Sequence, residues 1–143
     1  MRILVLNGPN LGRLGQRQPE IYGSTTLTEI VGALRDRASE SGHEIADMQT
    51  NHEGVLIDRI ELRDYDAVII NPGAWTHYSY AIRDALAACD KPVVEVHISD
   101  VSSREAFRQI NVLDGIPAHS VIGRGWRGYL DALDWLTGDA AKG

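Results

Sequence analysis

Short runs of aliphatic and β-branched residues alternate along the chain with longer segments in which apolar residues recur at helical spacing. The short runs predict buried strands at residues 3–6, 43–49, 67–70, 92–96 and 120–122. The longer segments predict a helix after each strand, at residues 27–38, 53–63, 78–89, a short stretch after 105, and 129–136.

Two sequence patterns predict where helices begin. Thr26 followed by Glu29 is a capping box, and Ser41-Gly42 predicts the end of the helix that it opens. Ser102 followed by Glu105 predicts a second capping box ahead of the short helix. On the helix after the third strand, the expected inward face consists of Tyr78, Ala81, Ile82, Ala85, Leu86 and Cys89.

Strict alternation of strand and helix predicts a parallel sheet covered on both faces, because each right-handed crossover returns its helix to the sheet. Five strands in 143 residues favour an α/β, flavodoxin-like sheet with strand order 2-1-3-4-5 over a closed barrel. No repeat or long linker divides the sequence. We therefore expect one domain over residues 1–143, with a frayed tail over residues 138–143.

The composition excludes several classes of protein. With 14 Lys and Arg against 20 Asp and Glu, the net charge of -6 gives no general attraction for nucleic acid or anionic membranes. Cys89 is the only cysteine, which excludes an internal disulfide and a four-cysteine zinc site. No apolar run approaches the ~20 residues of a membrane span, and the first residues do not resemble a signal peptide. We therefore expect a cytoplasmic protein.

Polar residues cluster where the predicted strands end. Asn7 and Asn10 follow the first strand, Asn71 ends the third, and His97 and Ser99 follow the fourth. In the expected order these three strands are neighbours, and open parallel sheets bind ligands beyond the carboxyl ends of their strands. The sequence therefore predicts one crevice at this edge of the sheet.

The loop after the first strand, residues 7–23, is long and begins with several glycines. The glycines fit neither the dinucleotide-binding pattern nor the P-loop pattern, so a turn is favoured over a phosphate cradle. Long ordered loops are often lids. Arg17 and Tyr22 both lie in this loop. The commoner interpretation is two exposed side chains. The alternative is that the Arg17 guanidinium lowers the pKa of Tyr22, which then acts as a tyrosinate base.

Glu95 and His97 lie two residues apart in the fourth strand, so both side chains point to the same face of the sheet. A buried carboxylate is costly unless it is paired, and Glu95 therefore requires a donor. A histidine held by a carboxylate suits proton transfer, and it equally suits a structural pair that supports the next loop.

Three further basic residues have two interpretations each. His77 is either an exposed residue at the start of a helix or part of the crevice. Arg104 and Arg108 lie one helical turn apart and are therefore expected on the same face of a helix. A solvated basic face is the usual meaning of such a pair, and a clamp for an anionic or polyhydroxylated substrate is the alternative. No H-E-x-x-H or G-x-S-x-G motif occurs, and Cys89 lies on the apolar face of a helix.

Several short motifs follow one another over nearly the whole chain. They are Asn7-Gly8-Pro9-Asn10-Leu11, Gly15-x-Arg17-x-Pro19, Tyr22-Gly23, Gln49-x-Asn51-x-Glu53-Gly54, Asn71-Pro72-Gly73-Ala74-x-Thr76-His77-x-Ser79, Arg83-Asp84-Ala85, Glu95-Val96-His97-Ile98-Ser99, Arg104-Glu105-x-Phe107-Arg108 and Gly128-Tyr129. Together they resemble the motifs of the type II 3-dehydroquinate dehydratase family. The resemblance implies a flavodoxin-like hydro-lyase, assembled as a homododecamer of trimers, that works without a metal or organic cofactor. Its reaction is the reversible loss of water from 3-dehydroquinate, which serves both aromatic biosynthesis and quinate breakdown.

The resemblance also implies a role for each catalytic residue. Tyr22, as a tyrosinate supported by Arg17, removes the C2 proton next to the ketone. Asn10 positions a water that stabilises the enolate. His97, oriented by Glu95, is the general acid for the departing C1 hydroxyl.

The substrate-binding residues follow from the same resemblance. They are Asn71, Gly73, His77, Asp84, Ile98, Ser99, Arg104 and Arg108. Asn71 and the backbone of Ile98 and Ser99 hold the substrate carboxylate. His77 and Arg108 bind ring hydroxyls with Asp84 of a neighbouring subunit, and Arg104 belongs to a closing lid.

Some positions depart from the family pattern. Asp100 stands where Asn is common, and a carboxylate there weakens binding by repulsion unless it is paired or points away. Gln109-Ile110-Asn111 replaces a common His/Arg-His-Ser stretch, and Trp75 replaces Leu or Tyr. Trp75 and Tyr80, expected to be exposed, are compatible with a subunit contact or with local packing. The alternatives are therefore a divergent member with poor turnover and a flavodoxin-like phosphate or flavin-binding module.

Overall fold

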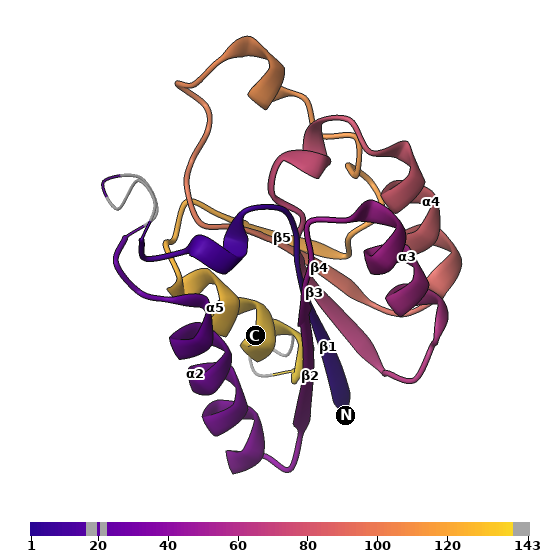
Figure 1. Cartoon of the computed structure of the whole chain (residues 1–143). Helices are drawn as coiled ribbons and strands as arrows, with labels where there is room; N and C mark the ends of the chain where they lie inside the picture. Colours follow the sequence, from indigo (N-terminus) through magenta and orange to yellow (C-terminus); the bar gives the residue numbers. More distant parts are fainter. Residues whose placement is uncertain (17–19, 21–22, 139–143) are drawn as a thin grey trace.

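A parallel sheet of five strands forms the centre of the computed structural model, which describes residues 1–16, 20 and 23–138 (Figure 1). The strand order is β2-β1-β3-β4-β5, so the predicted fold and strand order are confirmed. The strands are β1 (Arg2–Asn7), β2 (Glu44–Gln49), β3 (Ala67–Asn71), β4 (Val93–His97) and β5 (His119–Ile122). The helices are α2 (Leu27–Glu40), α3 (Glu53–Glu61), α4 (Tyr80–Cys89) and α5 (Arg127–Leu136), with short 3-10 helices η1 (Leu11–Arg13), η2 (Gly73–His77) and η3 (Ala106–Gln109). Apart from Gly138, the predicted frayed tail lies outside the described residues.

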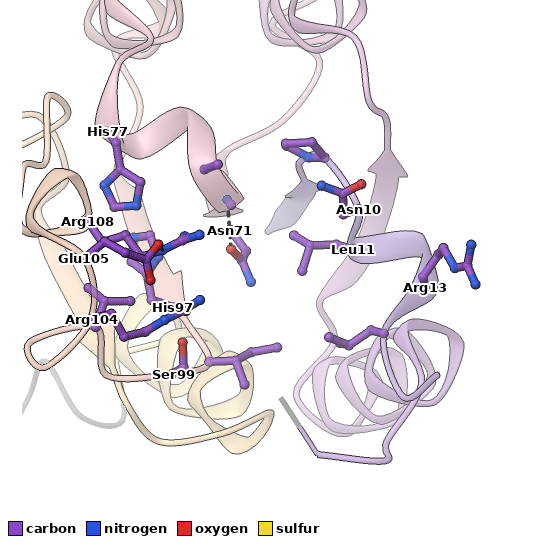
Figure 2. Close-up of a pocket in the computed structure, with 16 residues that line it drawn as sticks. Asn10, Leu11, Arg13, Asn71, His77, His97, Ser99, Arg104, Glu105 and Arg108 are labelled. Atoms are coloured by element: carbon purple, nitrogen blue, oxygen red, sulfur yellow. Dashed lines mark hydrogen bonds and ion pairs between the residues drawn. The ribbon is translucent and has the colours of Figure 1, made fainter. Parts of the chain in front are cut away.

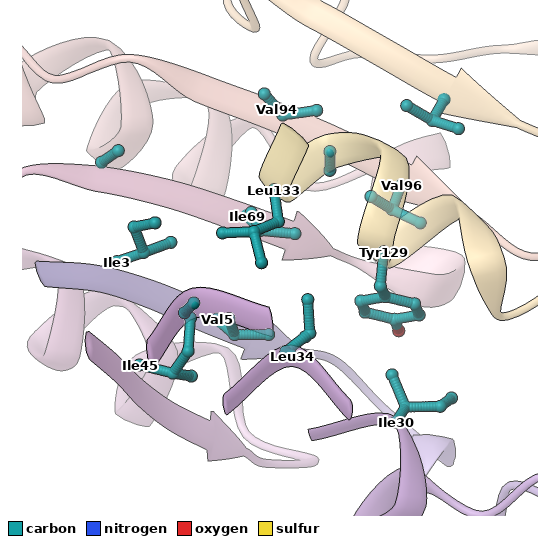
Figure 3. Packing of buried hydrophobic residues seen from close by; sticks show 14 of the residues in the cluster. Ile3, Val5, Ile30, Leu34, Ile45, Ile69, Val94, Val96, Tyr129 and Leu133 are labelled. Carbon is teal, nitrogen blue, oxygen red and sulfur yellow. The ribbon is translucent and has the colours of Figure 1, made fainter. Parts of the chain in front are cut away.

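Helices α2 and α5 cover one face of the sheet, and α3 and α4 cover the other (Figure 1). Successive residues of a strand point to opposite faces, and Ile3 and Val5 of β1 therefore pack with α2 and α5. Leu4 and Leu6 pack on the other side, with α3 and α4. Figure 3 shows Tyr129 of α5 among the side chains of the first core. Burial on both faces fixes the sheet and leaves the carboxyl ends of its strands to carry the loops.

The capping box that opens α2 is confirmed. Thr26 Oγ1 accepts a hydrogen bond from the backbone N of Glu29, and the Glu29 carboxylate accepts one from the backbone N of Thr26. These two bonds satisfy N–H groups that a helix start leaves without a partner.

The second predicted capping box is wrong. Helix η3 begins at Ala106, and its N-terminal residue Glu105 makes no side-chain capping bond. The backbone N of Ser102 donates instead to Asp100 Oδ1 at 2.9 Å, and the Glu105 carboxylate pairs with Arg108. Both groups of the expected box are therefore occupied by other partners.

The inward face predicted for the third helix is correct only in part. Ile82, Leu86 and Cys89 are buried, whereas Tyr78 is 57% exposed and precedes α4. Trp75, expected to be exposed, is only 3% exposed. The reason for both differences is η2, which inserts a tighter turn between β3 and α4 and so changes which side chains face the sheet.

No helix in the described part of the chain is long and apolar enough to cross a membrane.

Candidate active site

The carboxyl ends of β1, β3 and β4 surround a cavity of about 330 Å³. The parallel register sets Asn7 beside Asn71 at the ends of adjacent strands. The predicted site residues that line the cavity are Asn10, Asn71, Gly73, His77, His97, Ile98, Ser99, Arg104 and Arg108. The sheet therefore brings together side chains that are far apart in the sequence.

The remaining predicted residues lie elsewhere. Glu95 lies beneath His97 in β4 and is 1% exposed. Asp84 is exposed on α4 and does not line the cavity of its own chain. Arg17 and Tyr22 lie outside the described residues.

The two sides of the cavity differ in character (Figure 2). His77, His97, Arg104, Glu105 and Arg108 form one wall; Asn10, Leu11 and Arg13 form the other, and Asn71 lies between them. Residues 98–111, drawn in orange in Figure 1, extend above the sheet and supply most of the first wall. Three arginines against one carboxylate give the cavity a positive balance, which favours an anionic ligand.

Close approach of two loops fixes the back of the cavity. Gly8 follows β1, and a Cβ atom on it would lie 2.5 Å from the carbonyl oxygen of Pro72, which follows β3. Glycine is therefore required for the two strand ends to meet. Gln49 Nε2 donates to Gly8 O at 3.1 Å and thereby ties this loop to the end of β2 as well.

His97 and Glu95 form a buried hydrogen-bonded pair through His97 Nε2 and Glu95 Oε2. Both side chains point to the same face of β4, as predicted. The same carboxylate oxygen lies 2.9 Å from Thr76 Oγ1 and 3.0 Å from Asn111 Nδ2. The predicted need of Glu95 for donors is therefore met at Oε2, by two residues that sequence reasoning did not connect with Glu95, whereas the buried Oε1 has no partner among the described residues. Nothing in the spacing along the chain indicated either contact.

A second polar cluster joins Asn71 to the core. Asn71 Nδ2 donates to the hydroxyl of Tyr129 at 2.9 Å, and that hydroxyl donates to Asn7 Oδ1 at 2.6 Å. Asn71 Oδ1 accepts from the backbone N of Gly73 at 3.1 Å, so the orientation of the amide is fixed. Complete burial raises the pKa of Tyr129 well above its ordinary value, and the hydroxyl keeps its proton. Sequence reasoning placed Tyr129 at the start of the last helix and in a family motif, and it missed this polar role.

The arginine wall is held by its own contacts. Arg108 Nε lies 2.8 Å from Glu105 Oε2, and this contact lowers the pKa of the Glu105 carboxyl. The Arg108 guanidinium also lies 4.8 Å from the centre of the Phe107 ring. Arg104 precedes η3 and is not on a helix with Arg108 as predicted, although both side chains reach the cavity.

The sequence of the chain is similar to that of a known protein family. The sequence model of the family described as dehydroquinase class II matches residues 1–137 of this chain. The chain belongs to the class II dehydroquinases.

Relatives of this dehydroquinase match over nearly its whole length. The 3-dehydroquinate dehydratase of Roseiflexus castenholzii is 50% identical, covering 100% of this chain and 92% of the relative. That of Herpetosiphon aurantiacus is 51% identical, covering 95% and 96%.

Solved structures show the same fold. The crystal structure of type II dehydroquinase from Butyrivibrio crossotus matches with a TM-score of 0.92 and 44% identity, covering 96% of this chain and 97% of that one. A 3-dehydroquinate dehydratase-like protein from Bifidobacterium longum matches with a TM-score of 0.71 and 27% identity, covering 99% and 98%.

One departure from the family pattern is accommodated locally. Asp100 of this dehydroquinase is exposed, does not line the cavity, and accepts the hydrogen bond from Ser102 N. That bond lowers the pKa of the Asp100 carboxyl. The carboxylate is therefore paired and directed away from the cavity, which removes the expected repulsion.

The described residues of this dehydroquinase include no group of three His, Cys, Asp or Glu side chains placed to hold a metal ion. The cavity instead offers amides, guanidinium groups and one imidazole that is paired with a carboxylate. Such a set binds an anionic, hydroxylated small molecule and moves a proton within it.

Proposed function

We propose that this class II dehydroquinase is a 3-dehydroquinate dehydratase, which removes water reversibly from 3-dehydroquinate to give 3-dehydroshikimate. The observation that carries the proposal is the Glu95–His97 pair, which lies in a small cavity lined with amides and arginines. The full-length similarity to proteins named 3-dehydroquinate dehydratase supports the same substrate.

Tyr22, assisted by Arg17, takes the C2 proton of the substrate. A proton next to a ketone is weakly acidic, so a phenolate is a more effective base for it than an ordinary carboxylate. The resulting enolate needs preorganised donors around its oxygen, and Asn10 supplies one by holding a water molecule. The position of Asn10 on the cavity wall supports this role.

His97 completes the elimination as the general acid. The enolate returns to the ketone and its electron pair forms the C1–C2 double bond, while the C1–O bond breaks and its electron pair leaves with the oxygen. The proton of the imidazolium converts that oxygen into water. Tyr22 has gained a proton and His97 has lost one, so proton exchange with solvent restores both. Glu95 remains ionised throughout and holds the imidazole ring in place.

The substrate is held by both walls of the cavity. Its carboxylate binds Asn71 and the backbone of Ile98 and Ser99 at the strand ends, beside Gly73. His77 and Arg108 bind its ring hydroxyls, and Arg104 closes over it. All of these residues line the same cavity, which supports the assignment.

Twelve chains assemble as four trimers, and Asp84 acts in the cavity of a neighbouring chain. The exposure of Asp84 outside its own cavity supports this arrangement, as do Tyr78 and Tyr80, which are 57% and 68% exposed. Light scattering tests it, with an expected mass of about twelve times the 15.7 kDa of the chain. A monomer at assay concentration would contradict this part of the proposal.

The decisive experiment adds 3-dehydroquinate to the purified protein and follows the absorbance of the conjugated enone product. The Tyr22→Phe variant is expected to lose about 10²–10⁴-fold in kcat, the usual contribution of a general base, while circular dichroism stays that of the wild type. Tyr80→Phe is the matched control, because its hydroxyl lies outside the cavity. Absence of enone formation by the wild type would overturn the function, and full activity of Tyr22→Phe would remove Tyr22 from the mechanism.

A further inference from the structure

Asn111 contacts the catalytic carboxylate from a different part of the chain. Its Nδ2 atom lies 3.0 Å from Glu95 Oε2, although the two residues are 16 positions apart. Asn111 follows η3, at the end of the segment that carries Arg104 and Arg108 into the cavity.

The orientation of the Asn111 amide is fixed by its other contacts. The backbone N of Leu113 lies 2.8 Å from Asn111 Oδ1, and a backbone N–H can only donate. The oxygen of the amide therefore faces Leu113, and the NH₂ group faces Glu95. Thr76 Oγ1, at 2.9 Å from both Asn111 Oδ1 and Glu95 Oε2, completes the cluster.

These donors determine where the proton of the His97–Glu95 pair resides. The Asn111 amide donates to Glu95 Oε2, and an oxygen that accepts such a bond is a weaker site for a proton of its own, so the hydrogen shared with His97 is favoured on His97 Nε2. The other ring nitrogen, Nδ1, is then the one that serves the cavity. Donors to a carboxylate stabilise its charged form, so they favour a carboxylate–imidazolium pair over a neutral pair with the proton on Glu95. Only the charged pair presents a strong acid at Nδ1.

Other charged groups surround this pair from each neighbouring element. Arg104, Glu105 and Arg108 line the same cavity from residues 98–111, His77 lines it from η2, and Arg13 lines it from η1. Among the described residues, Glu95 is hydrogen-bonded to His97, Thr76 and Asn111.

The segment that ends at Asn111 is also docked on η2. Val112 N donates to Thr76 O at 2.7 Å, and His77 Nδ1 donates to Ile110 O at 2.7 Å. Through residues 110–112, the segment that carries Arg104 and Arg108 is joined by hydrogen bonds to the His97–Glu95 pair.

We propose that Asn111, supported by Thr76, is a positioning residue that keeps the His97–Glu95 pair in its charged form and directs Nδ1–H of His97 into the cavity. The proposal rests on the proposed function for its catalytic meaning, but the state of the His97 ring is measurable without substrate.

The experiment records the ring-nitrogen NMR shifts of isotopically labelled histidine in the free protein. The His97→Gln variant assigns the signals of His97. In the wild type, at a pH where His97 is an imidazolium and Glu95 is ionised, both ring nitrogens of His97 are expected to have N–H shifts. Asn111→Leu, which removes the donor at similar size, is expected to convert Nε2 to an unprotonated nitrogen.

Turnover is measured in parallel. Loss of a hydrogen bond to a charged group corresponds to about a 10- to 100-fold loss in kcat, with KM changed much less. Thr76→Val tests the same cluster without altering the loop, and it decides the question if Asn111→Leu does not fold. Asp114→Ala is the control, since that exposed side chain belongs to the same loop.

Wild-type ring shifts in both variants would overturn the proposal, even if kcat fell, because the role of Asn111 would then be structural only. A wild-type protein that is inactive on 3-dehydroquinate, but whose His97 shifts depend on Asn111, would overturn the function and not the state of the pair.

Discussion

Single buried polar side chains decide how the cavity is shaped. The hydroxyl of Tyr129 lies between Asn7 and Asn71, so a residue on α5 orients two amides at the ends of β1 and β3. The hydroxyl acts at once as donor and acceptor, which requires that it stay protonated, and burial raises the pKa of Tyr129 in the direction that ensures this. The side chain is therefore both a core residue and part of the support of the active site.

The Tyr129→Phe variant is expected to be less stable by about 1–3 kcal/mol, because buried amide groups of Asn7 and Asn71 lose their partner. Asn71 Nδ2 also loses the partner that holds it against the core, so the amide is positioned less precisely and KM is expected to rise more than kcat falls. Urea unfolding and steady-state kinetics measure the two effects.

Tyr65→Phe is the matched control for this prediction. The Tyr65 hydroxyl is also buried and donates to Ile60 O at 2.6 Å, but it does not line the cavity. That variant is expected to lose stability and to keep the wild-type KM. An equal rise in KM in both variants would contradict a specific role of Tyr129.

Among the elements, the long helices and the 3-10 helices differ in what determines them. Helix α2 has an apolar stripe, a capping box and a terminating Ser41-Gly42, so its own residues specify both of its ends. Helices η2 and η3 have 5 and 4 residues and no side-chain cap. Their positions depend on contacts with other parts of the chain, and both carry residues that line the cavity.

Replacing the capping residue of α2 by Thr26→Ala is expected to lower the free energy of unfolding by about 1 kcal/mol, since one helix N–H loses its acceptor. Hydrogen bonds from Thr26 lower the pKa of Glu29, so its charge stabilises the fold above the ordinary pKa of a Glu carboxyl. This contribution is lost as the pH falls through the lowered pKa of Glu29. Glu29→Gln is therefore expected to have a lower free energy of unfolding than the wild type at neutral pH, and this difference is expected to vanish in strong acid.

Urea unfolding at the two pH values measures these effects, with Thr28→Ala as the control in the same helical turn. Thr28→Ala is expected to cost no stability, because alanine has a higher helix propensity than threonine; a cost as large as that for Thr26→Ala would contradict a specific role of the cap.

The whole molecule combines a rigid sheet with a site at one edge. Residues of β1, β3 and β4 that are far apart in the sequence meet there because the strands are parallel and adjacent. Ionisable groups elsewhere in the fold determine the range of pH over which this arrangement is stable.

Stability is expected to fall at alkaline pH. Burial, and then the neighbouring Cys89, raise the pKa of Tyr65 to about 12, whereas an unfolded tyrosine ionises near pH 10. The unfolded chain therefore loses this proton first, and the free energy of unfolding declines as the pH rises from about 10 to about 12. Tyr129, whose pKa is also raised by burial, acts in the same direction.

Denaturant unfolding across this range measures the decline, and Tyr65→Phe is expected to make it shallower. An unchanged slope in that variant would contradict the contribution of Tyr65.

The sequence by itself determined the strands, their order, the capping of α2 and the shared face of Glu95 and His97. These features depend on local periodicity and on neighbours a few residues away, which the sequence displays directly. It also predicted that the ends of the first, third and fourth strands meet in one crevice, since parallel topology requires it.

Only the tertiary structure decided which residues support the site. Thr76 and Asn111 reach Glu95, and Tyr129 reaches Asn7 and Asn71, through contacts between distant segments. Trp75 is buried because the 3-10 helix η2 between β3 and α4 changes which side chains face the sheet. Such contacts depend on how the elements pack in three dimensions, and periodicity along the chain carries no record of them.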